Sequence, residues 1–236
     1  MKCDTIHEVA DISCAKVGGL EVYHRPGTTD EKVIEEVIKR KAYTLRGRFY
    51  VEKEDRWLDL GANIGTFSLF SAKSGAAVKA YEPEPNNFSL LMMNLRANGL
   101  DVDCRHSAVS AYDFDSVNLY ICSGEYNKYR HTTKKTRGRK PIKVDCSKFS
   151  EIIEGFDCVK MDIEGSELPI LDEFDDWSRF RKLVFEYHFD HDRLISRFEK
   201  RMDKLRDNFI HVNYAKMPDA VTYDYFPAAR VVHCWS

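Results

Sequence analysis

Short apolar runs and stretches of helical apolar spacing alternate along the chain from about residue 56 onward. Short runs bounded by glycine or proline are typical of buried strands, and apolar residues three or four positions apart predict helices with one buried face. The strands predicted on this basis span residues 56–60, 77–85, 102–109, 156–165 and 182–188. Strands that alternate with helices favour an α/β domain built on a parallel sheet.

The predicted helices lie before, between and after these strands. They span residues 31–41, 67–74, 146–154 and 190–208, and a further helix is expected to start at an N-cap, Asn86 or Asn87, and to end before Gly99. Thr28, Thr29 and Asp30 are candidate N-caps of the first helix, which should pack near the mouth of the sheet.

The remaining segments carry weaker patterns. Residues up to about 21 are expected to form a poorly specified lead-in, residues 22–24 a short strand, and residues 43–51 a hairpin or strand that leads into the sheet. Residues 117–122 and 141–144 predict an added β-hairpin, and residues 209–215 and 230–235 predict two final strands.

Composition narrows the class of protein. The 236 residues carry a formal net charge of −2, so the total charge gives no argument for a nucleic-acid or membrane partner. Seven cysteines, an odd number without a C-x-x-C pair, argue against a zinc ribbon or a disulfide framework and favour a reducing compartment. Because no stretch resembles a signal peptide or a membrane span, we expect one domain in the cytoplasm.

A glycine turn follows the predicted strand 56–60. Asp59 stands at the end of the strand, and the run DLGANIG continues through Gly61, Ala62, Asn63 and Gly65. We expect Gly61 and Gly65 to let the backbone pass close to a ligand, and Asp59 to reach a polar group over the turn. The turn lacks the G-x-G-x-x-G spacing of dinucleotide-binding sites, so the ligand need not carry phosphates. The alternative is a turn that only connects a strand to a helix.

The next two strand ends offer further contacts for such a ligand. Glu82 precedes Pro83 about twenty residues after the turn, where a carboxylate can accept hydrogen bonds from ribose hydroxyls. Ser107 and Ala108 are small residues on which an adenine ring could lie flat. Taken alone, Glu82 would be an ordinary solvated acid before a proline turn, but its spacing from the glycine turn favours binding.

The loop 123–140 is strongly basic. Its positive residues and histidine are Lys128, Arg130, His131, Lys134, Lys135, Arg137, Arg139 and Lys140. The loop is either a solvated surface segment or a flap that attracts an anionic substrate, such as a phosphorylated sugar, an acidic glycan or RNA.

Charged residues also gather at the last two central strands. Alternation places Lys160, Asp162 and Glu164 on one side of the strand 156–165, where three charged groups are costly unless they are used or paired. A lysine–aspartate ion pair is the structural alternative. The next strand brings Glu186 and His188 to the same end of the sheet, where they could bind or deprotonate a hydroxyl group.

These motifs together resemble the FkbM family of class I S-adenosylmethionine-dependent methyltransferases. The run KMDIEGSE from Lys160 to Glu167 matches the pattern K-x-D-x-E-G-x-E in full, and the run DLGANIG and the tripeptide YEP precede it in family order. The resemblance covers about residues 25–188 and implies a Rossmann-like α/β fold with a seven-stranded, mostly parallel sheet and a reversed last strand. We expect a single methyltransferase domain over residues 1–236, with residues 1–50 packed near the cofactor mouth.

The resemblance also implies roles for the singled-out residues. S-adenosylmethionine would bind at Asp59, Gly61, Ala62, Asn63, Gly65, Glu82, Pro83, Ser107 and Ala108. The catalytic group would consist of Lys160, Asp162, Glu164, Glu186 and His188. Either Asp162, or Glu186 with His188, would be the general base, and Glu164 would orient the acceptor. Asp162, Glu164, Glu186 and His188 are hard ligands that could hold Mg²⁺, although we expect a mechanism without a metal.

The acceptor is less constrained than the cofactor. The family methylates hydroxyl groups of varied molecules, among them macrolides and sugars, and we expect a hydroxyl of a sugar or glycan. The basic loop departs from the family pattern and motivates one alternative, an RNA methyltransferase. The alternative from outside the enzymes is a non-catalytic binding module with the same fold, which the acids at three strand ends disfavour. RNA is disfavoured because residues 134–140 contain no aromatic side chain for stacking.

Overall fold

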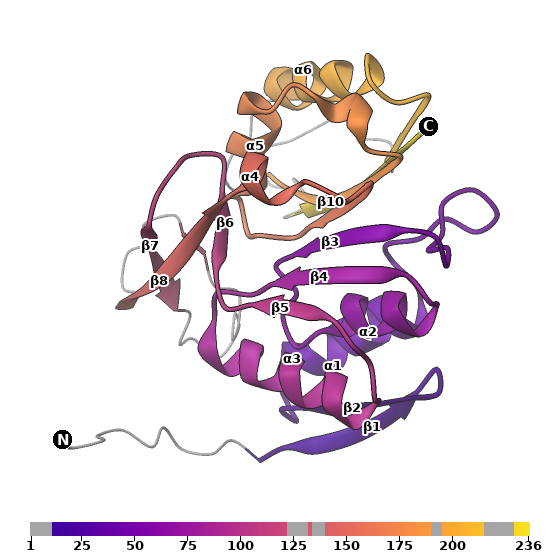
Figure 1. Cartoon of the computed structure of the whole chain (residues 1–236), viewed down its shortest axis with the longest axis vertical. Helices are drawn as coiled ribbons and strands as arrows, with labels where there is room; N and C mark the ends of the chain where they lie inside the picture. The colour runs from indigo at the N-terminus through magenta and orange to yellow at the C-terminus, as the bar shows by residue number, and fades with distance from the viewer. Residues whose placement is uncertain (1–10, 122–131, 134–139, 190–194, 215–228) are drawn as a thin grey trace.

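The computed structural model describes residues 11–121, 132–133, 140–189, 195–214 and 229–236. A seven-stranded sheet runs through this part of the chain in the order β11-β12-β10-β9-β3-β4-β5 (Figure 1). Its strands are β3 Arg56–Leu60, β4 Ala77–Tyr81, β5 Asp103–Arg105, β9 Cys158–Met161, β10 Lys182–His188, β11 His211–Tyr214 and β12 Ala229–Trp235. β12 is antiparallel to both neighbours, whereas β10, β9, β3, β4 and β5 pair in parallel. The predicted sheet with a reversed last strand is confirmed.

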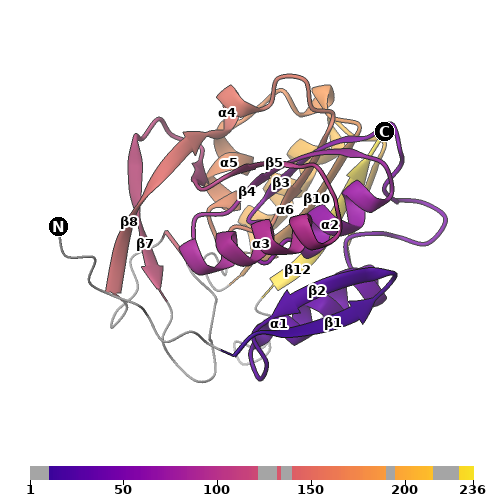
Figure 2. The same ribbon diagram turned by 60° about the horizontal axis from the view of Figure 1, so that its bottom comes forward.

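Helices cover both faces of this sheet (Figure 2). They are α1 Thr29–Ile34, which continues as a π-helix over Glu35–Lys39, α2 Thr66–Lys73, α3 Pro85–Ala97, α4 Phe149–Ile152, α5 Glu167–Glu173 and α6 Ile195–Arg206. Alternate side chains of β3 point to opposite faces of the sheet. Trp57 packs with Phe67 of α2, and Leu58 lies in the cluster that contains Phe198 of α6. β3 is thus buried on both sides, as its mostly apolar sequence predicts.

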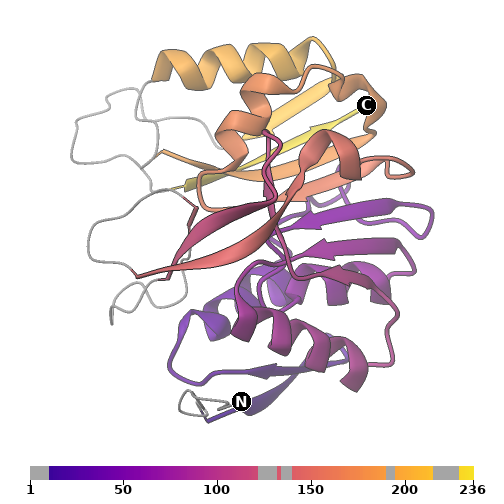
Figure 3. The ribbon, with the colours of Figure 1, turned by 60° about the vertical axis from the view of Figure 1, so that its left-hand side comes forward.

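A smaller sheet stands beside the main one, in the order β6-β8-β7 (Figure 3). β7 Ser116–Ile121 and β8 Lys140–Lys148 form the predicted added hairpin, and β8 is longer than expected. The prediction of one strand over 102–109 is wrong. The chain leaves the edge of the main sheet after Arg105, and β6 Ala108–Ser110 pairs in parallel with β8 instead.

The amino-terminal segment is more ordered than the sequence suggests. β1 Ser13–Val17 and β2 Leu20–His24 form a hairpin where we predicted a lead-in and one short strand. Two asparagine side chains hold it, because Asn94 of α3 accepts from the Tyr23 N–H at 2.6 Å and Asn98, the C-cap of α3, accepts from the Glu21 N–H at 2.9 Å. Most of β1 is exposed, so its residues carry little apolar signal.

Three further local features differ from the prediction. Residues 43–51 form turns with a single bridge between Leu45 and Phe49 in place of a hairpin or strand. The N-cap of α3 is Glu84, whose side chain accepts from the Asn87 N–H, so neither Asn86 nor Asn87 is the cap. The helix expected over 146–154 is limited to α4, since its first residues extend β8.

Some predicted features lie outside the described residues. They include most of the basic loop 123–140, the start of the predicted helix 190–208 and the link between the two final strands. Within the described residues, no helix combines the length and apolar character needed to cross a membrane.

Candidate active site

Two cavities meet at the carboxyl ends of β3 and β9. The first is lined by Glu82, Pro83, Ser107 and Ala108, and the second by residues of α1, the following π-helix and the ends of β9 and β10. Gly61, Asn63, Asp162 and Glu164 line both cavities, so the two lie next to each other beside the glycine turn. The carboxyl end of a parallel sheet is where ligands bind in open α/β folds.

Glu82 is the acidic group of the first cavity. Its Oε2 accepts from the Asn63 N–H at 2.8 Å and its Oε1 from the Glu84 N–H at 2.9 Å, and the residue is 5% exposed. Burial raises the pKa of Glu82 to about 7, although both backbone hydrogen bonds act in the opposite direction. Each carboxylate oxygen has a second lone pair, so Glu82 can also accept from a ligand.

Asp59 and Lys160 form a buried ion pair beneath the glycine turn. Their Oδ1 and Nζ atoms lie 3.1 Å apart, and Asp59 Oδ2 accepts from the Ser68 hydroxyl at 2.6 Å. The Lys160 ammonium also donates to the Gly61 carbonyl at 2.8 Å. Burial lowers the pKa of Lys160, but the charges of Asp59 and Asp162 outweigh it and raise this pKa. Lys160 is therefore paired, but with Asp59 of β3 and not with the aspartate of its own strand segment that the sequence suggested, and the pair supports the turn.

The glycines of the turn are required by packing within the protein. A β-carbon at Gly61, where φ is +75°, would collide with the backbone carbonyl of Asp162. A β-carbon at Gly65, where φ is +92°, would collide with the Leu91 side chain. Asp59 and Gly65 line neither cavity, and Ala62 lines only the second. Of the predicted cofactor residues, the other six line the first cavity.

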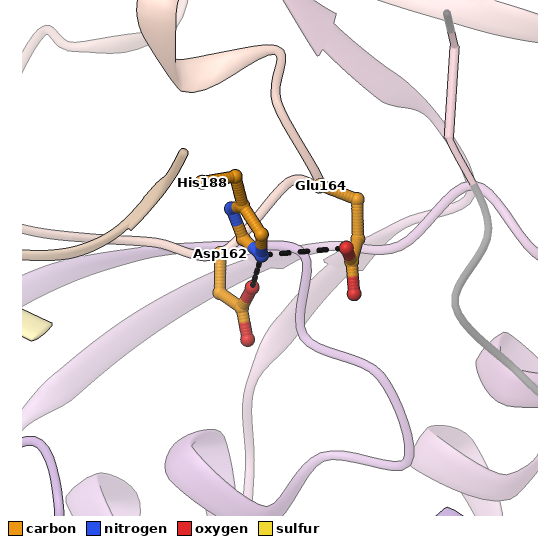
Figure 4. Close-up of side chains that lie close together, drawn as sticks. All are labelled: Asp162, Glu164 and His188. Carbon is orange, nitrogen blue, oxygen red and sulfur yellow. Dashed lines mark ion pairs between the residues drawn. The ribbon is translucent and has the colours of Figure 1, made fainter. Parts of the chain in front are cut away.

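Four of the five predicted catalytic residues come together around one imidazole. His188 Nε2 lies 3.3 Å from Glu164 Oε2, 3.6 Å from Glu186 Oε2 and 3.9 Å from Asp162 Oδ1. Figure 4 shows the imidazole directed between Asp162 and Glu164. The carboxylates are partly exposed, whereas His188 is fully buried. Lys160 is the exception, because its ammonium is paired with Asp59.

Glu167 fixes this imidazole and was not among the predicted site residues. Its buried carboxylate lies 2.7 Å from His188 Nδ1 and accepts from the Gly165 N–H at 2.7 Å. Burial lowers the pKa of His188, but Glu167, Glu164 and Asp162 together raise it to about 10. Glu167 is the last acid of the K-x-D-x-E-G-x-E run, so the sequence did contain a signal for it.

Two neighbouring groups influence the carboxylates Glu186 and Asp162. The charge of Asp162, followed by burial, raises the pKa of Glu186 to about 8, so Glu186 can hold a proton near neutral pH. The Tyr43 hydroxyl donates to Asp162 Oδ2 at 2.9 Å, and burial together with the Asp162 and Glu186 charges raises the pKa of Tyr43. Tyr43 was not predicted, because it lies in a turn without a regular pattern.

The loop that carries Glu164 is held from the hairpin side. Glu164 has φ +51°, so the alternation assumed for residues 156–165 ends with β9 at Met161. Thr132 Oγ1 donates to the Glu164 carbonyl at 2.9 Å, and the Thr133 and Ser166 hydroxyls lie 2.6 Å apart. Asp162 and Glu164 thus reach the cavities through a turn and not through a continued strand.

The family follows from comparison of the whole sequence. The sequence profile of the methyltransferase FkbM domain matches residues 59–210, which is more than half of the chain. The chain belongs to the FkbM methyltransferase family. The match contains the glycine turn and the acid–histidine cluster, whereas Tyr43 and the β1–β2 hairpin precede it.

Individual relatives are distant. Methyltransferase sdnD of Sordaria araneosa is 25% identical over 167 residues, which are 55% of this chain and 64% of that protein. The chain therefore spans less than two thirds of the length of this relative.

Solved structures share the architecture. A Pyrococcus abyssi tRNA (uracil-54, C5)-methyltransferase, solved with S-adenosyl-L-homocysteine, is similar with a TM-score of 0.52 and 13% identity over 95% of this chain and 44% of that chain. Methyltransferase FkbM of Methylobacillus flagellatus KT has a TM-score of 0.49 and 15% identity over 80% of this chain and 46% of that chain. The first likeness shows a Rossmann-like class I methyltransferase fold.

Proposed function

We propose that this FkbM-family protein is an S-adenosylmethionine-dependent O-methyltransferase that acts on a hydroxyl group of a sugar or glycan. The observation that carries the proposal is the pair of neighbouring cavities that share Asp162 and Glu164 in their linings. One cavity carries the buried acid Glu82, and the other is lined by Glu186 and Tyr43. A methyl donor in the first cavity and an acceptor in the second would meet at the carboxylate cluster.

The first cavity fits the proposed cofactor. Glu82 offers two carboxylate oxygens to the ribose hydroxyls, and Ser107 and Ala108 give small surfaces beside it for the adenine. The amino-acid part would lie over the glycine turn, whose shape Lys160 supports through the Gly61 carbonyl. When bound, the sulfonium group supplies an activated methyl group, as the family membership and the S-adenosyl-L-homocysteine in the related tRNA methyltransferase suggest.

The protein must align the acceptor oxygen and remove its proton. Glu164 orients the hydroxyl, and the proton passes to Asp162 or to Glu186 acting with His188. Both acids lie next to the same imidazole, which Glu167 holds in place. The carboxylate–imidazole cluster therefore provides a base for the hydroxyl proton. The neighbouring charged groups of the cluster stabilise the base after it has taken up this proton.

A polyhydroxylated acceptor suits this chemistry. The second cavity is lined by four acidic residues, Glu36, Asp162, Glu164 and Glu186, and carboxylates are strong acceptors for neighbouring sugar hydroxyls. The test is transfer of a labelled methyl group from S-adenosylmethionine to a panel of sugars, sugar nucleotides, glycans and RNA. Labelled sugar or glycan supports the proposal, and label in RNA alone would replace it with the RNA alternative.

Replacing Glu82 by alanine should weaken S-adenosylhomocysteine binding by about 1–3 kcal/mol, or roughly 5–150-fold, because ribose hydroxyls would lose a buried acceptor. Calorimetric titration measures the change. Glu151→Gln, at an exposed position, is the control and should bind like the parent. Equal affinity of Glu82→Ala and the parent would place the ribose contact elsewhere.

Cofactor binding should depend on pH through Glu82. Its pKa is raised to about 7, and hydroxyl donors favour the ionised form, so affinity should be lost as pH falls through this pKa. Between pH 8 and pH 6 the affinity for S-adenosylhomocysteine should fall by up to about tenfold. Glu82→Gln should remove this dependence, and a parent protein with constant affinity over the same range would contradict the role of Glu82.

A further inference from the structure

We infer that Asp162, Glu164 and His188 form a binding site for a divalent transition-metal cation of the Mn²⁺ type. One ligand atom from each residue lies within 4.8 Å of the other two. The three come from separate parts of the main sheet edge, since Asp162 and Glu164 follow β9 and His188 ends β10. The inference rests on the proposed function for its chemical role, but cation binding itself can be measured separately.

The separations fit a cation with little rearrangement. Neighbouring ligands of an octahedral cation with bonds of about 2.1 Å are about 3.0 Å apart. His188 Nε2 lies 3.3 Å from Glu164 Oε2 and 3.9 Å from Asp162 Oδ1. The Asp162 oxygen would have to approach His188 Nε2 by about 0.9 Å and the Glu164 oxygen by about 0.3 Å, and both carboxylates are partly exposed, so they have room to move.

The histidine is presented as a metal ligand commonly is. His188 is fully buried, its Nε2 is directed into the group of carboxylates (Figure 4), and its Nδ1 is held by the buried carboxylate of Glu167 at 2.7 Å. A carboxylate on the second imidazole nitrogen fixes the orientation of a ligating histidine and increases its basicity. The Tyr43 hydroxyl likewise holds the other oxygen of Asp162, Oδ2, and leaves Oδ1 toward His188.

The donor set selects the kind of cation. Carboxylates suit Mg²⁺, Ca²⁺ and Mn²⁺, whereas imidazole suits later transition metals. Two carboxylates and one imidazole, with open positions toward the cavities, therefore favour Mn²⁺ over Mg²⁺.

A cation here would complete the proposed reaction. An acceptor hydroxyl bound at an open position would become more acidic, as metal-bound water does. Glu186, 3.6 Å from His188 Nε2, would then receive the hydroxyl proton while the acceptor oxygen takes the methyl group and S-adenosylhomocysteine leaves. Asp162 and Glu164 would act as ligands in this arrangement.

Electron paramagnetic resonance with Mn²⁺ tests the site without an acceptor, because bound Mn²⁺ loses the sharp signal of the free ion. We expect one Mn²⁺ per chain in protein first treated with a chelator. Glu164→Gln should weaken binding at least about tenfold, and Glu167→Gln by about 10–100-fold. Glu154→Gln, whose side chain is 91% exposed, is the matched control and should bind like the parent.

S-adenosylhomocysteine is titrated into the same samples without metal. If the parent protein binds S-adenosylhomocysteine but does not bind Mn²⁺, the metal site is overturned and the proposed function is unaffected. Stoichiometric Mn²⁺ binding without cofactor binding supports the site and counts against the function. Equal Mn²⁺ affinity of Glu164→Gln and the parent would also overturn the site, and circular dichroism of each variant verifies that it is folded.

Discussion

Replacing Asp162 by asparagine should lower the turnover of methyl transfer by about 10²–10⁴-fold, the range typical of lost general-base catalysis. Affinity for S-adenosylhomocysteine should change by no more than a few-fold. Asp162 contacts the Tyr43 hydroxyl and faces His188, so its carboxylate is placed for the acceptor and is not required by the ribose site around Glu82. Single-turnover transfer of a labelled methyl group, with the acceptor found by the screen, measures the effect.

Asp175→Asn is the matched control, since the Asp175 side chain is 88% exposed and lies outside both cavities. Its turnover should equal that of the parent. A normal rate for Asp162→Asn would rule out Asp162 as the general base and as a required metal ligand. The general base would then be Glu186 acting with His188.

Replacing Lys160 by methionine should lower the free energy of unfolding by about 3–5 kcal/mol, because it leaves the charge of Asp59 buried without its partner. Asp59 is fully buried and Lys160 is 3% exposed. The loss should also release the Gly61 carbonyl and weaken cofactor binding at the turn. Urea denaturation followed by circular dichroism gives the change in stability.

The double variant Asp59→Asn/Lys160→Met should recover much of this loss, since no unpaired charge remains. Lys16→Met, in an exposed ion pair with Glu21, should leave stability nearly unchanged. A stability of Lys160→Met equal to that of Lys16→Met would show that the buried pair does not support the turn.

The sequence predicts the centre of the fold better than its margins. Central strands such as β3 are buried on both faces, so they appear as short, mostly apolar runs, and a glycine turn follows β3. β1 has no such signal because its residues are mostly exposed, and its partner β2 is held by Asn94 of α3 and by Asn98 at the end of that helix. Likewise, local pattern cannot reveal that the chain changes sheets between Arg105 and Ala108.

The candidate site was predictable where its residues follow strands. Glu82, Glu186 and Asp162 lie at strand ends, and strand ends of a parallel sheet share an edge. The orientation of Asp59 was not predictable, because its pairing with Lys160 and Ser68 depends on the neighbouring strand and helix. Tyr43 reaches Asp162 across 119 positions of sequence from a turn, which no spacing rule describes.

Binding of S-adenosylhomocysteine tests the central claim most directly, because it needs neither the acceptor nor a metal. The measurement is calorimetric titration of the purified chain, with NAD as the comparison ligand and Glu82→Ala as the comparison protein. We expect one bound S-adenosylhomocysteine per chain, no binding of NAD, and weaker binding by Glu82→Ala. Absence of S-adenosylhomocysteine binding by the folded parent protein would contradict the proposed cofactor site and favour a non-catalytic binding module with this fold.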